Sequence, residues 1–157
     1  MANVSFKPFV LILAMTQPVS PQDSNLNQIP RILPVPGLEN PSGNIYYWDE
    51  SPLFPQGIKR SFWICGVAAG EIRGKHAHYQ ESQLLVAMNG LLRVRVESAS
   101  GEVSHFSLSS PAEGLFVPPM NWVEVEFSPG AVLLGLADRA YDESDYIRDK
   151  KDFGSKH

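Results

Sequence analysis

The chain has 157 residues, of which 43% are hydrophobic and 19% are charged, and its formal net charge is −4. This composition is ordinary for one globular domain, since a chain of this length buries roughly two-thirds of its unfolded surface. The acidic balance and the lack of a long basic run argue against a nucleic-acid-binding protein. The single cysteine, Cys65, excludes an intramolecular disulfide and fits a reducing cytoplasm. It lies in an apolar run, where we expect a small buried side chain.

The first part of the chain lacks the pattern of a folded domain. The apolar run at residues 9–15 is far shorter than the ~20 residues that span a bilayer. A signal peptide is an alternative, but no convincing cleavage site follows the run. The next segment, up to residue 28, is rich in Pro, Ser, Gln and Asn, as linkers are. We therefore expect a flexible or extended arm at 1–28, one domain at 29–153, a tail at 154–157, and a cytoplasmic protein without membrane contact.

From Ile29 onward, short apolar segments alternate with turn residues, which is typical of an all-β sandwich or barrel. The expected strands are Gly43–Trp48, Arg60–Val67, Ser82–Met88, Leu91–Glu97, Glu102–Leu108, Gly114–Val117, Asn121–Phe127 and Ala131–Ala137. Asn89-Gly90 gives the strongest turn signal, a type I′ turn with positive φ at both central residues. About eight strands and few helices favour an all-β double-sheet jelly roll closed into a barrel. The charged and aromatic end at 141–153 predicts a short helix or a strap across the barrel.

Two histidines are the strongest candidates for functional residues. On a strand, residues two apart point to the same side, so His76 and His78 face one cavity while Ala77 faces away. We expect the following hairpin, which ends at Asn89-Gly90, to return Gln83 beside them on the paired strand. The spacing of Gly70, His76, His78, Gln83 and Gly90 matches the first cupin motif, with Gln83 in the usual place of a glutamate. This resemblance implies that the jelly-roll barrel is a cupin double-stranded β-helix.

The histidine pair fits two kinds of chemistry. In metal-dependent cupins, these histidines, the glutamate and a histidine from a second motif hold a divalent ion. Here Gln83 is a weak ligand and residues 114–124 contain no histidine, so we expect no metal and no other cofactor. A metal site completed by Glu124 is the weaker alternative. Imidazole titrates near neutral pH, which favours a metal-free acid–base site.

Further segments match one family more closely than cupins in general. The most specific is the tail at 141–148, Tyr-Asp-Glu-Ser-Asp-Tyr-Ile-Arg. The others are Ile58-Lys59-Arg60, Arg73-Gly74-Lys75-His76-Ala77-His78, Gln83, Gly114-Leu115-Phe116-Val117-Pro118-Pro119 and Trp122. Together they resemble the sugar 3,4-ketoisomerases, the FdtA/WxcM-like group, and the similarity runs from about Ile29 to Phe153.

This resemblance implies a homodimeric, metal-independent isomerase that acts on a dTDP-linked 4-keto-6-deoxy sugar in deoxysugar and surface-polysaccharide synthesis. Such enzymes move a carbonyl from C4 to C3 through an enediol. The resemblance implies that His76 is the base and that His78 is its partner in proton transfer. Arg73 is a candidate contact for the diphosphate, because guanidinium binds phosphate in a bidentate fashion. The other expected substrate-binding residues are Arg60, Phe62, Gln83 and Trp122.

The chain also departs from this family. Phe62 stands where a tyrosine is thought to assist catalysis, and phenylalanine has no hydroxyl to donate. Val123 stands where arginine is frequent. By residue type alone, Tyr46, Tyr47 and Arg93 are candidates for compensation. Two alternatives therefore stay open: a cupin that binds a nucleotide sugar without turnover, and, more weakly, a metal-dependent cupin enzyme.

Overall fold

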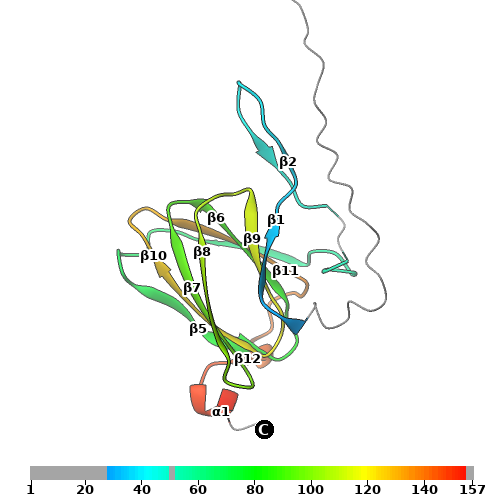
Figure 1. The fold of residues 1–157 in the computed structure, drawn as a ribbon. Coiled ribbons are helices and arrows are strands. Elements are labelled where there is room, and N and C mark those ends of the chain that lie inside the picture. The colour runs from blue at the N-terminus through cyan, green and yellow to red at the C-terminus, as the bar shows by residue number, and fades with distance from the viewer. Residues whose placement is uncertain (1–27, 50–51, 155–157) are drawn as a thin grey trace, which may run out of the picture.

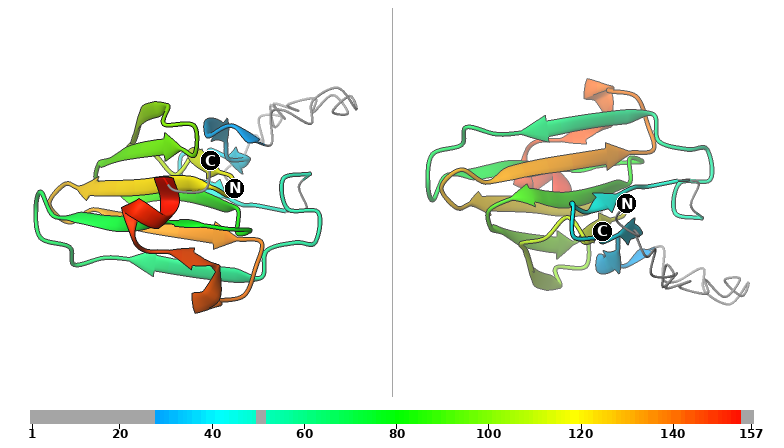
Figure 2. Two further views of the ribbon diagram at one scale, coloured as in Figure 1. Left: turned by 90° about the horizontal axis from the view of Figure 1, so that it is seen from below. Right: turned by 90° about the horizontal axis from the view of Figure 1, so that it is seen from above.

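The computed structural model describes residues 28–49 and 52–154, which form two five-stranded antiparallel sheets packed face to face (Figures 1 and 2). The first sheet contains, in spatial order, β1 (Arg31–Pro34), β9 (Glu113–Val117), β6 (Gln83–Asn89), β11 (Val132–Ala137) and β4 (Arg60–Ile64). The second contains β12 (Tyr146–Ile147), β5 (Ile72–His78), β10 (Asn121–Phe127), β7 (Leu92–Ser98) and β8 (Val103–Leu108). The predicted jelly-roll fold is confirmed.

Three smaller elements lie outside this barrel. A two-stranded hairpin, β2 (Gly37–Leu38) and β3 (Ile45–Tyr46), projects away from it in Figure 1. A 3-10 turn, η2 (Glu143–Asp145), precedes β12, and a short helix, α1 (Lys150–Gly154), ends the described chain. The predicted arm at 1–28 lies almost wholly outside the described residues, so the predicted domain limits stay a prediction. No helix among the described residues is long and apolar enough to cross a membrane.

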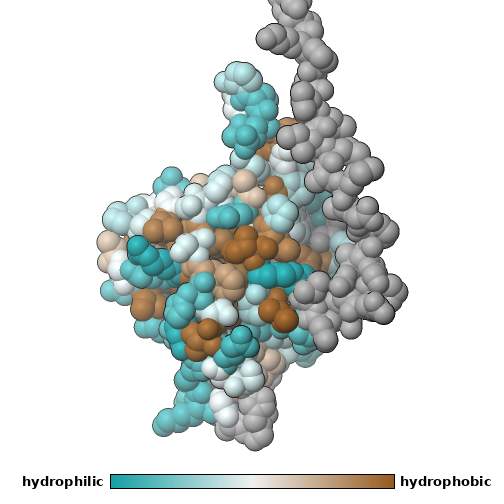
Figure 3. Space-filling model, viewed as in Figure 1, coloured by the Kyte–Doolittle hydropathy of each residue, from teal (hydrophilic) through white to brown (hydrophobic). Residues whose placement is uncertain are grey.

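The main core lies between the two sheets, where alternate residues of each strand meet. Val123 and Val125 of β10 point inward with Val94 and Val96 of β7, as their alternation with charged residues predicts. Burying each such side chain contributes about 1.5–3 kcal/mol. A second cluster, around Phe116 on the outer face of the first sheet, is covered by Leu33, Val35, Trp48, Leu53 and Phe54. On the face shown in Figure 3, apolar residues are interspersed with polar ones.

Most strand predictions are confirmed. Each predicted segment contains a strand, although Gly43–Trp48 shrinks to the two residues of β3. Four strands, β1, β2, β5 and β12, are missing from the predicted segments, although the alternation of His76 and His78 presupposed a strand at β5. Of these, β1 and β12 are short edge strands that depend on a neighbour for their hydrogen bonds, whereas β5 lies inside its sheet. Cys65 is exposed, contrary to the prediction, because β4 is an edge strand that ends one residue earlier, at Ile64.

The turn at Asn89-Gly90 was predicted wrongly. β6 and β7 belong to different sheets, so the turn carries the chain from one sheet to the other and closes no hairpin. Of the two turn residues, Gly90 has a positive φ of 74° and Asn89 does not, so the turn is not type I′. The Asn89 side chain instead donates to the Gly130 carbonyl at 2.8 Å, and a Cβ on Gly90 would lie 2.8 Å from the Ala131 Cα. Close packing against the loop between β10 and β11 therefore explains why residue 90 is a glycine.

Candidate active site

A cavity of about 560 Å³ opens between the two sheets, on the side of β4 and β5. Its polar groups include histidine, arginine, tyrosine and glutamine, and the remaining lining is aliphatic or aromatic. The lining residues from the first sheet are Arg60, Phe62, Ile64, Gln83, Leu85 and Leu133. Those from the second sheet are Ile72, Arg73, Gly74, His76, Val123 and Val125. The C-terminal segment adds Tyr141, Tyr146 and Arg148. An apolar cavity with a few convergent polar groups is the usual form of a small-molecule site.

A β-bulge at Gly74 and Lys75 brings Arg73 and His76 to the same side of β5. His76 lies opposite Val123 of β10 and Gly74 lies opposite Glu124, so Lys75 is the extra residue. Both bulge residues have positive φ, 85° at Gly74 and 57° at Lys75. In a regular strand, Arg73 and His76 would face opposite sides because they are three residues apart. The extra residue shifts the alternation by one, so that both face the same side. Both predicted side chains therefore reach the cavity.

His76 is the histidine that faces the cavity. Its ring lies 5.0 Å from the ring of His78 and 5.0 Å from that of Tyr146, measured between centroids. Burial lowers the pKa of His76, a backbone hydrogen bond at Gly74 partly opposes this, and Arg148 and Arg60 lower the pKa further. His76 is therefore neutral near pH 7, in the state that accepts a proton.

His78 lies behind His76, is only 6% exposed and does not line the cavity. Its Nδ1 is 3.1 Å from Asp145 Oδ2, and its Nε2 is 3.3 Å from Gln83 Nε2. Because an amide nitrogen only donates, Nε2 accepts, and the ring proton is on Nδ1 and faces Asp145. Burial, followed by the neighbouring His76, lowers the pKa of His78 to about 4, although Asp145 opposes the shift. His78 is thus held neutral in one tautomer.

Gln83 reaches the histidines from the opposite sheet and not from a strand paired with β5 as predicted. β5 pairs with β10 and β12, whereas β6 pairs with β9 and β11. Residues 79–82 connect the two sheets, and the side chain of Gln83 then points back across the barrel interior. It also donates to Glu81 Oε1 at 2.5 Å, so both amide hydrogens of Gln83 have acceptors.

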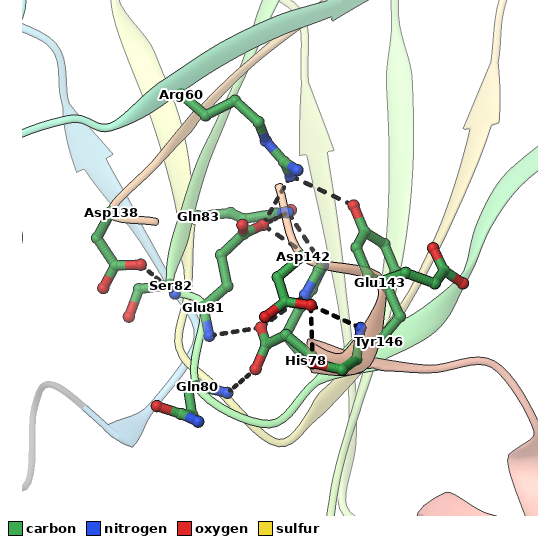
Figure 4. Close-up of polar contacts among 12 residues, drawn as sticks. Arg60, His78, Gln80, Glu81, Ser82, Gln83, Asp138, Asp142, Glu143 and Tyr146 are labelled. Atoms are coloured by element: carbon green, nitrogen blue, oxygen red, sulfur yellow. Dashed lines mark hydrogen bonds and ion pairs between the residues drawn. The ribbon is translucent and has the colours of Figure 1, made fainter. Parts of the chain in front are cut away.

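A buried ion pair supports this group (Figure 4). Glu81 is 3% exposed, and its Oε1 accepts from Arg60 Nη2 at 2.9 Å. Burial raises the pKa of Glu81, and the contacts with Gln83 and Arg60 oppose that shift. The same Arg60 nitrogen lies 3.3 Å from the hydroxyl of Tyr146. Arg60 thus lines the cavity and also connects Glu81 with the C-terminal segment.

The C-terminal segment at 141–148, which was predicted to form a short helix or a strap across the barrel, forms part of the site. β12 pairs with the end of β5, so that Tyr146 lies opposite His78. Asp145 accepts from the backbone N–H groups of Gln80 at 2.9 Å and Glu81 at 3.1 Å, in addition to its contact with His78. The sequence signal was the specific tail motif, but nothing local showed which strand it would join.

Arginine guanidinium groups lie on several sides of the cavity. Arg73 and Arg148 line it together with Arg60. Arg148 forms an ion pair with Glu143, and hydrogen bonds from Arg148 hold the pKa of that carboxyl at about 2. Three guanidinium groups around one cavity favour an anionic ligand. In the part of the chain that the structure describes, no group of three or more His, Cys, Asp or Glu side chains is arranged to hold a metal ion.

Other residues considered from the sequence lie elsewhere. Trp122, predicted to bind substrate, is buried on the far side of the second sheet, in the apolar cluster Ala77, Trp122, Ile147 and Phe153. Figure 2 shows α1 lying across that side. Tyr46 bonds Glu39 in the projecting hairpin, and Arg93 pairs with Glu126 on the surface. Neither these two residues nor Tyr47 lines the cavity, so none of them compensates for Phe62 or Val123 there.

The chain is similar to known proteins over most of its length. A family model described as "FdtA: WxcM-like, C-terminal" matches residues 22–157. The TDP-4-oxo-6-deoxy-alpha-D-glucose-3,4-oxoisomerase of Aneurinibacillus thermoaerophilus is 38% identical over 112 residues, 71% of this chain and 80% of that protein. The structure of QdtA, a sugar 3,4-ketoisomerase from Thermoanaerobacterium thermosaccharolyticum, in complex with TDP, superimposes with a TM-score of 0.76 at 30% identity, covering 81% of this chain and 93% of QdtA. A 3,4-ketoisomerase from Helicobacter canadensis gives a TM-score of 0.74 at 31% identity, with 80% and 94% covered.

Proposed function

The chain belongs to the FdtA family (WxcM-like, C-terminal), and on this basis we propose that it is a 3,4-ketoisomerase of a TDP-linked 4-keto-6-deoxy sugar. The observation that carries the proposal is the position of His76, which faces a cavity lined by three arginines and is backed by His78, whose two ring nitrogens contact Asp145 and Gln83.

The reaction requires a base next to the sugar ring. The C4 ketone acidifies the neighbouring C3–H bond, and His76 takes that proton as the C3=C4 double bond of an enediol forms. Return of a proton to C4 and loss of the O3 proton leave the carbonyl at C3. Imidazole suits both directions of transfer because it gains and loses a proton near neutral pH. No bound metal enters these steps.

The remaining cavity residues have separate roles in this proposal. Arg73 and Arg148, at the cavity, bind the diphosphate, while the aliphatic lining contacts the apolar parts of the ligand. His78 is a positioning residue, since both of its ring nitrogens are engaged within the protein. This replaces its expected role as a proton shuttle.

We also propose that the protein is a cytoplasmic homodimer that acts in deoxysugar and polysaccharide synthesis. Trp63, on β4 at the edge of the first sheet, is 70% exposed. A large exposed aromatic side chain on an edge strand is a typical dimer contact. Sedimentation equilibrium tests this assembly, and Trp63→Ser is expected to weaken it.

Incubation with TDP-4-keto-6-deoxyglucose tests the function. Carbon-13 NMR is expected to show loss of the C4 carbonyl signal and growth of a C3 carbonyl signal. Titration with TDP by calorimetry distinguishes the main alternative, a nucleotide-sugar-binding protein without turnover. Saturable binding without any 3-keto product would favour that alternative. The alternative arises for this chain because Phe62 has no hydroxyl where the family has a tyrosine.

A further inference from the structure

The proposed isomerisation needs a hydrogen-bond donor on the sugar oxygen at C4. When His76 removes the C3 proton, negative charge develops on that oxygen, and an unassisted enolate is costly in a partly apolar cavity. Phe62 lies in the lining and carries no hydroxyl. The cavity contains two phenolic hydroxyls, those of Tyr141 and Tyr146.

The hydroxyl of Tyr141 is already engaged. It donates to a carboxylate oxygen of Glu143, which in turn is paired with Arg148. That hydrogen bond raises the pKa of Tyr141, which makes its proton harder to transfer. The side chain is also 61% exposed, so a bound sugar oxygen competes with water there. Tyr141 is therefore a poor acid.

The hydroxyl of Tyr146 is arranged differently. Arg60 Nη2 lies 3.3 Å from the phenolic oxygen of Tyr146, and a guanidinium only donates, so this oxygen is the acceptor. The hydroxyl proton is thereby directed away from Arg60 and is available to a ligand. Arg60 is itself fixed by the buried Glu81, and its positive charge stabilises a phenolate that forms next to it.

The ring of Tyr146 is also held beside the base. Its centroid lies 5.0 Å from that of His76 and 4.2 Å from that of His78, and the Arg148 guanidinium covers the ring at 4.3 Å. The β12–β5 pairing fixes the backbone, with Tyr146 opposite His78. The acid and the base thus lie side by side along one strand pair, which matches two neighbouring sugar carbons.

We propose that Tyr146 is the catalytic acid of the reaction, donating to the C4 oxygen while His76 takes the C3 proton; this inference rests on the proposed function. In the first half, the C3–H bond breaks to His76, the C3=C4 bond forms, and the Tyr146 proton moves to the C4 oxygen. In the second half, the O3 proton returns to the Tyr146 phenolate, the C3 carbonyl forms, and His76 delivers its proton to C4. Both side chains end in their starting states, and no oxidant or reductant is required.

The test compares the wild-type protein with Tyr146→Phe, which keeps the ring and its contacts and removes only the hydroxyl. With TDP-4-keto-6-deoxyglucose, kcat is expected to fall about 100-fold, the typical effect of removing one oxyanion donor. The dissociation constant for TDP is expected to change less than about threefold, because the arginines that bind anions remain. Tyr47→Phe, which removes a hydroxyl outside the cavity, is the matched control and should leave kcat unchanged.

The outcomes separate the two proposals. A wild-type protein that forms no 3-keto product overturns the proposed function and this inference with it. An active wild-type protein with an undiminished kcat in Tyr146→Phe overturns the role of Tyr146 alone. A 100-fold lower kcat in Tyr141→Phe, with kcat unchanged in Tyr146→Phe, would likewise overturn the role of Tyr146. Thermal melting of each variant confirms that a lost rate does not come from unfolding.

Discussion

Single residues in the site are fixed by contacts that join distant parts of the sequence. Asp145 illustrates this, since its carboxylate accepts from His78 Nδ1 and from two backbone N–H groups, those of Gln80 and Glu81. The sequence identified the histidine pair by its spacing, because strand alternation is a local property. It did not identify Asp145 as a partner, because 67 residues separate Asp145 from His78 and no local pattern reports such a contact.

Removing the Asp145 carboxylate is expected to weaken both the fold and the site. Asp145→Ala leaves three donors without their acceptor, which costs about 2–4 kcal/mol of unfolding free energy when the groups are buried. Activity is expected to fall as well, because His78 loses its fixed tautomer and Tyr146 its anchor. Urea unfolding and turnover measure the two effects.

Asp149→Ala is the matched control for that change. Asp149 lies in the same C-terminal segment, and its carboxylate accepts from an exposed backbone N–H, that of Lys151, at 2.8 Å. Its loss is expected to cost about 1 kcal/mol, as for a helix cap, without loss of turnover. Equal losses of unfolding free energy in the two variants would show that the contacts of Asp145 stabilise the fold no more than an exposed cap does.

At the scale of elements, the sequence predicts strands well and their partners poorly. β7 and β10 alternate clearly between apolar and charged residues, and both are found where expected. The segment after His78 also reads as a strand, but periodicity does not say whether the next strand pairs with its predecessor or crosses to the other sheet. Gln83 was therefore placed near the histidines for the wrong reason. The bulge in β5 was not anticipated either, although it decides that Arg73 faces the cavity.

Gly74→Ala tests the importance of this bulge. Gly74 has φ of 85°, and an added Cβ would lie 2.6 Å from the Val123 carbonyl oxygen. A left-handed non-glycine residue costs about 1–3 kcal/mol by itself, and the close contact adds to that cost. We expect lower stability in urea and a lower kcat, because relief of the contact shifts the neighbouring His76.

Gly101→Ala supplies the control, since its φ of 84° is nearly the same and nothing lies within 4 Å of its added Cβ. It measures the backbone cost alone, about 1–3 kcal/mol, with turnover unchanged. If Gly74→Ala behaves like Gly101→Ala in both assays, the geometry of the bulge does not matter for the site.

At the scale of the whole molecule, the fold and the family were predictable, and part of the site was not. The jelly roll follows from the number of short strands, and the family follows from motifs that match in order along the chain. The site combines the interior faces of two sheets with a C-terminal segment, so its residues meet only in the folded structure. Trp122 shows the limit of motif matching, because a tryptophan in a matching segment was assigned to the ligand and packs instead against Phe153.

The buried histidines also make the stability of the whole molecule depend on pH. The pKa of His78 is about 4 in the folded state and about 6.5 when unfolded, so between these values the unfolded state binds more protons. The stabilising effect of a neutral His78 is therefore complete above pH 6.5 and is lost as the pH falls towards 4. His76, whose pKa is also lowered by burial, acts in the same direction.

The unfolding free energy is expected to fall by on the order of 2 kcal/mol between pH 7 and pH 5. Carboxylates with lowered pKa, such as Glu143, contribute mainly below this window. Urea unfolding at the two pH values measures the difference, and His78→Asn is expected to reduce it. A wild-type protein equally stable at both pH values would contradict the inference that His78 is buried in its neutral form.

The proposed function depends on one step, the removal of the C3 proton of a TDP-linked 4-keto sugar by His76. Proton NMR of TDP-4-keto-6-deoxyglucose in D₂O, with wild-type protein and with His76→Asn, follows this step through the C3–H signal. Wild-type protein is expected to exchange this proton for deuterium, and His76→Asn is expected to bind TDP but to reduce the exchange by at least about 100-fold. Exchange at the wild-type rate in His76→Asn would show that His76 is not the base, and the absence of exchange in the wild-type protein would overturn the proposed reaction.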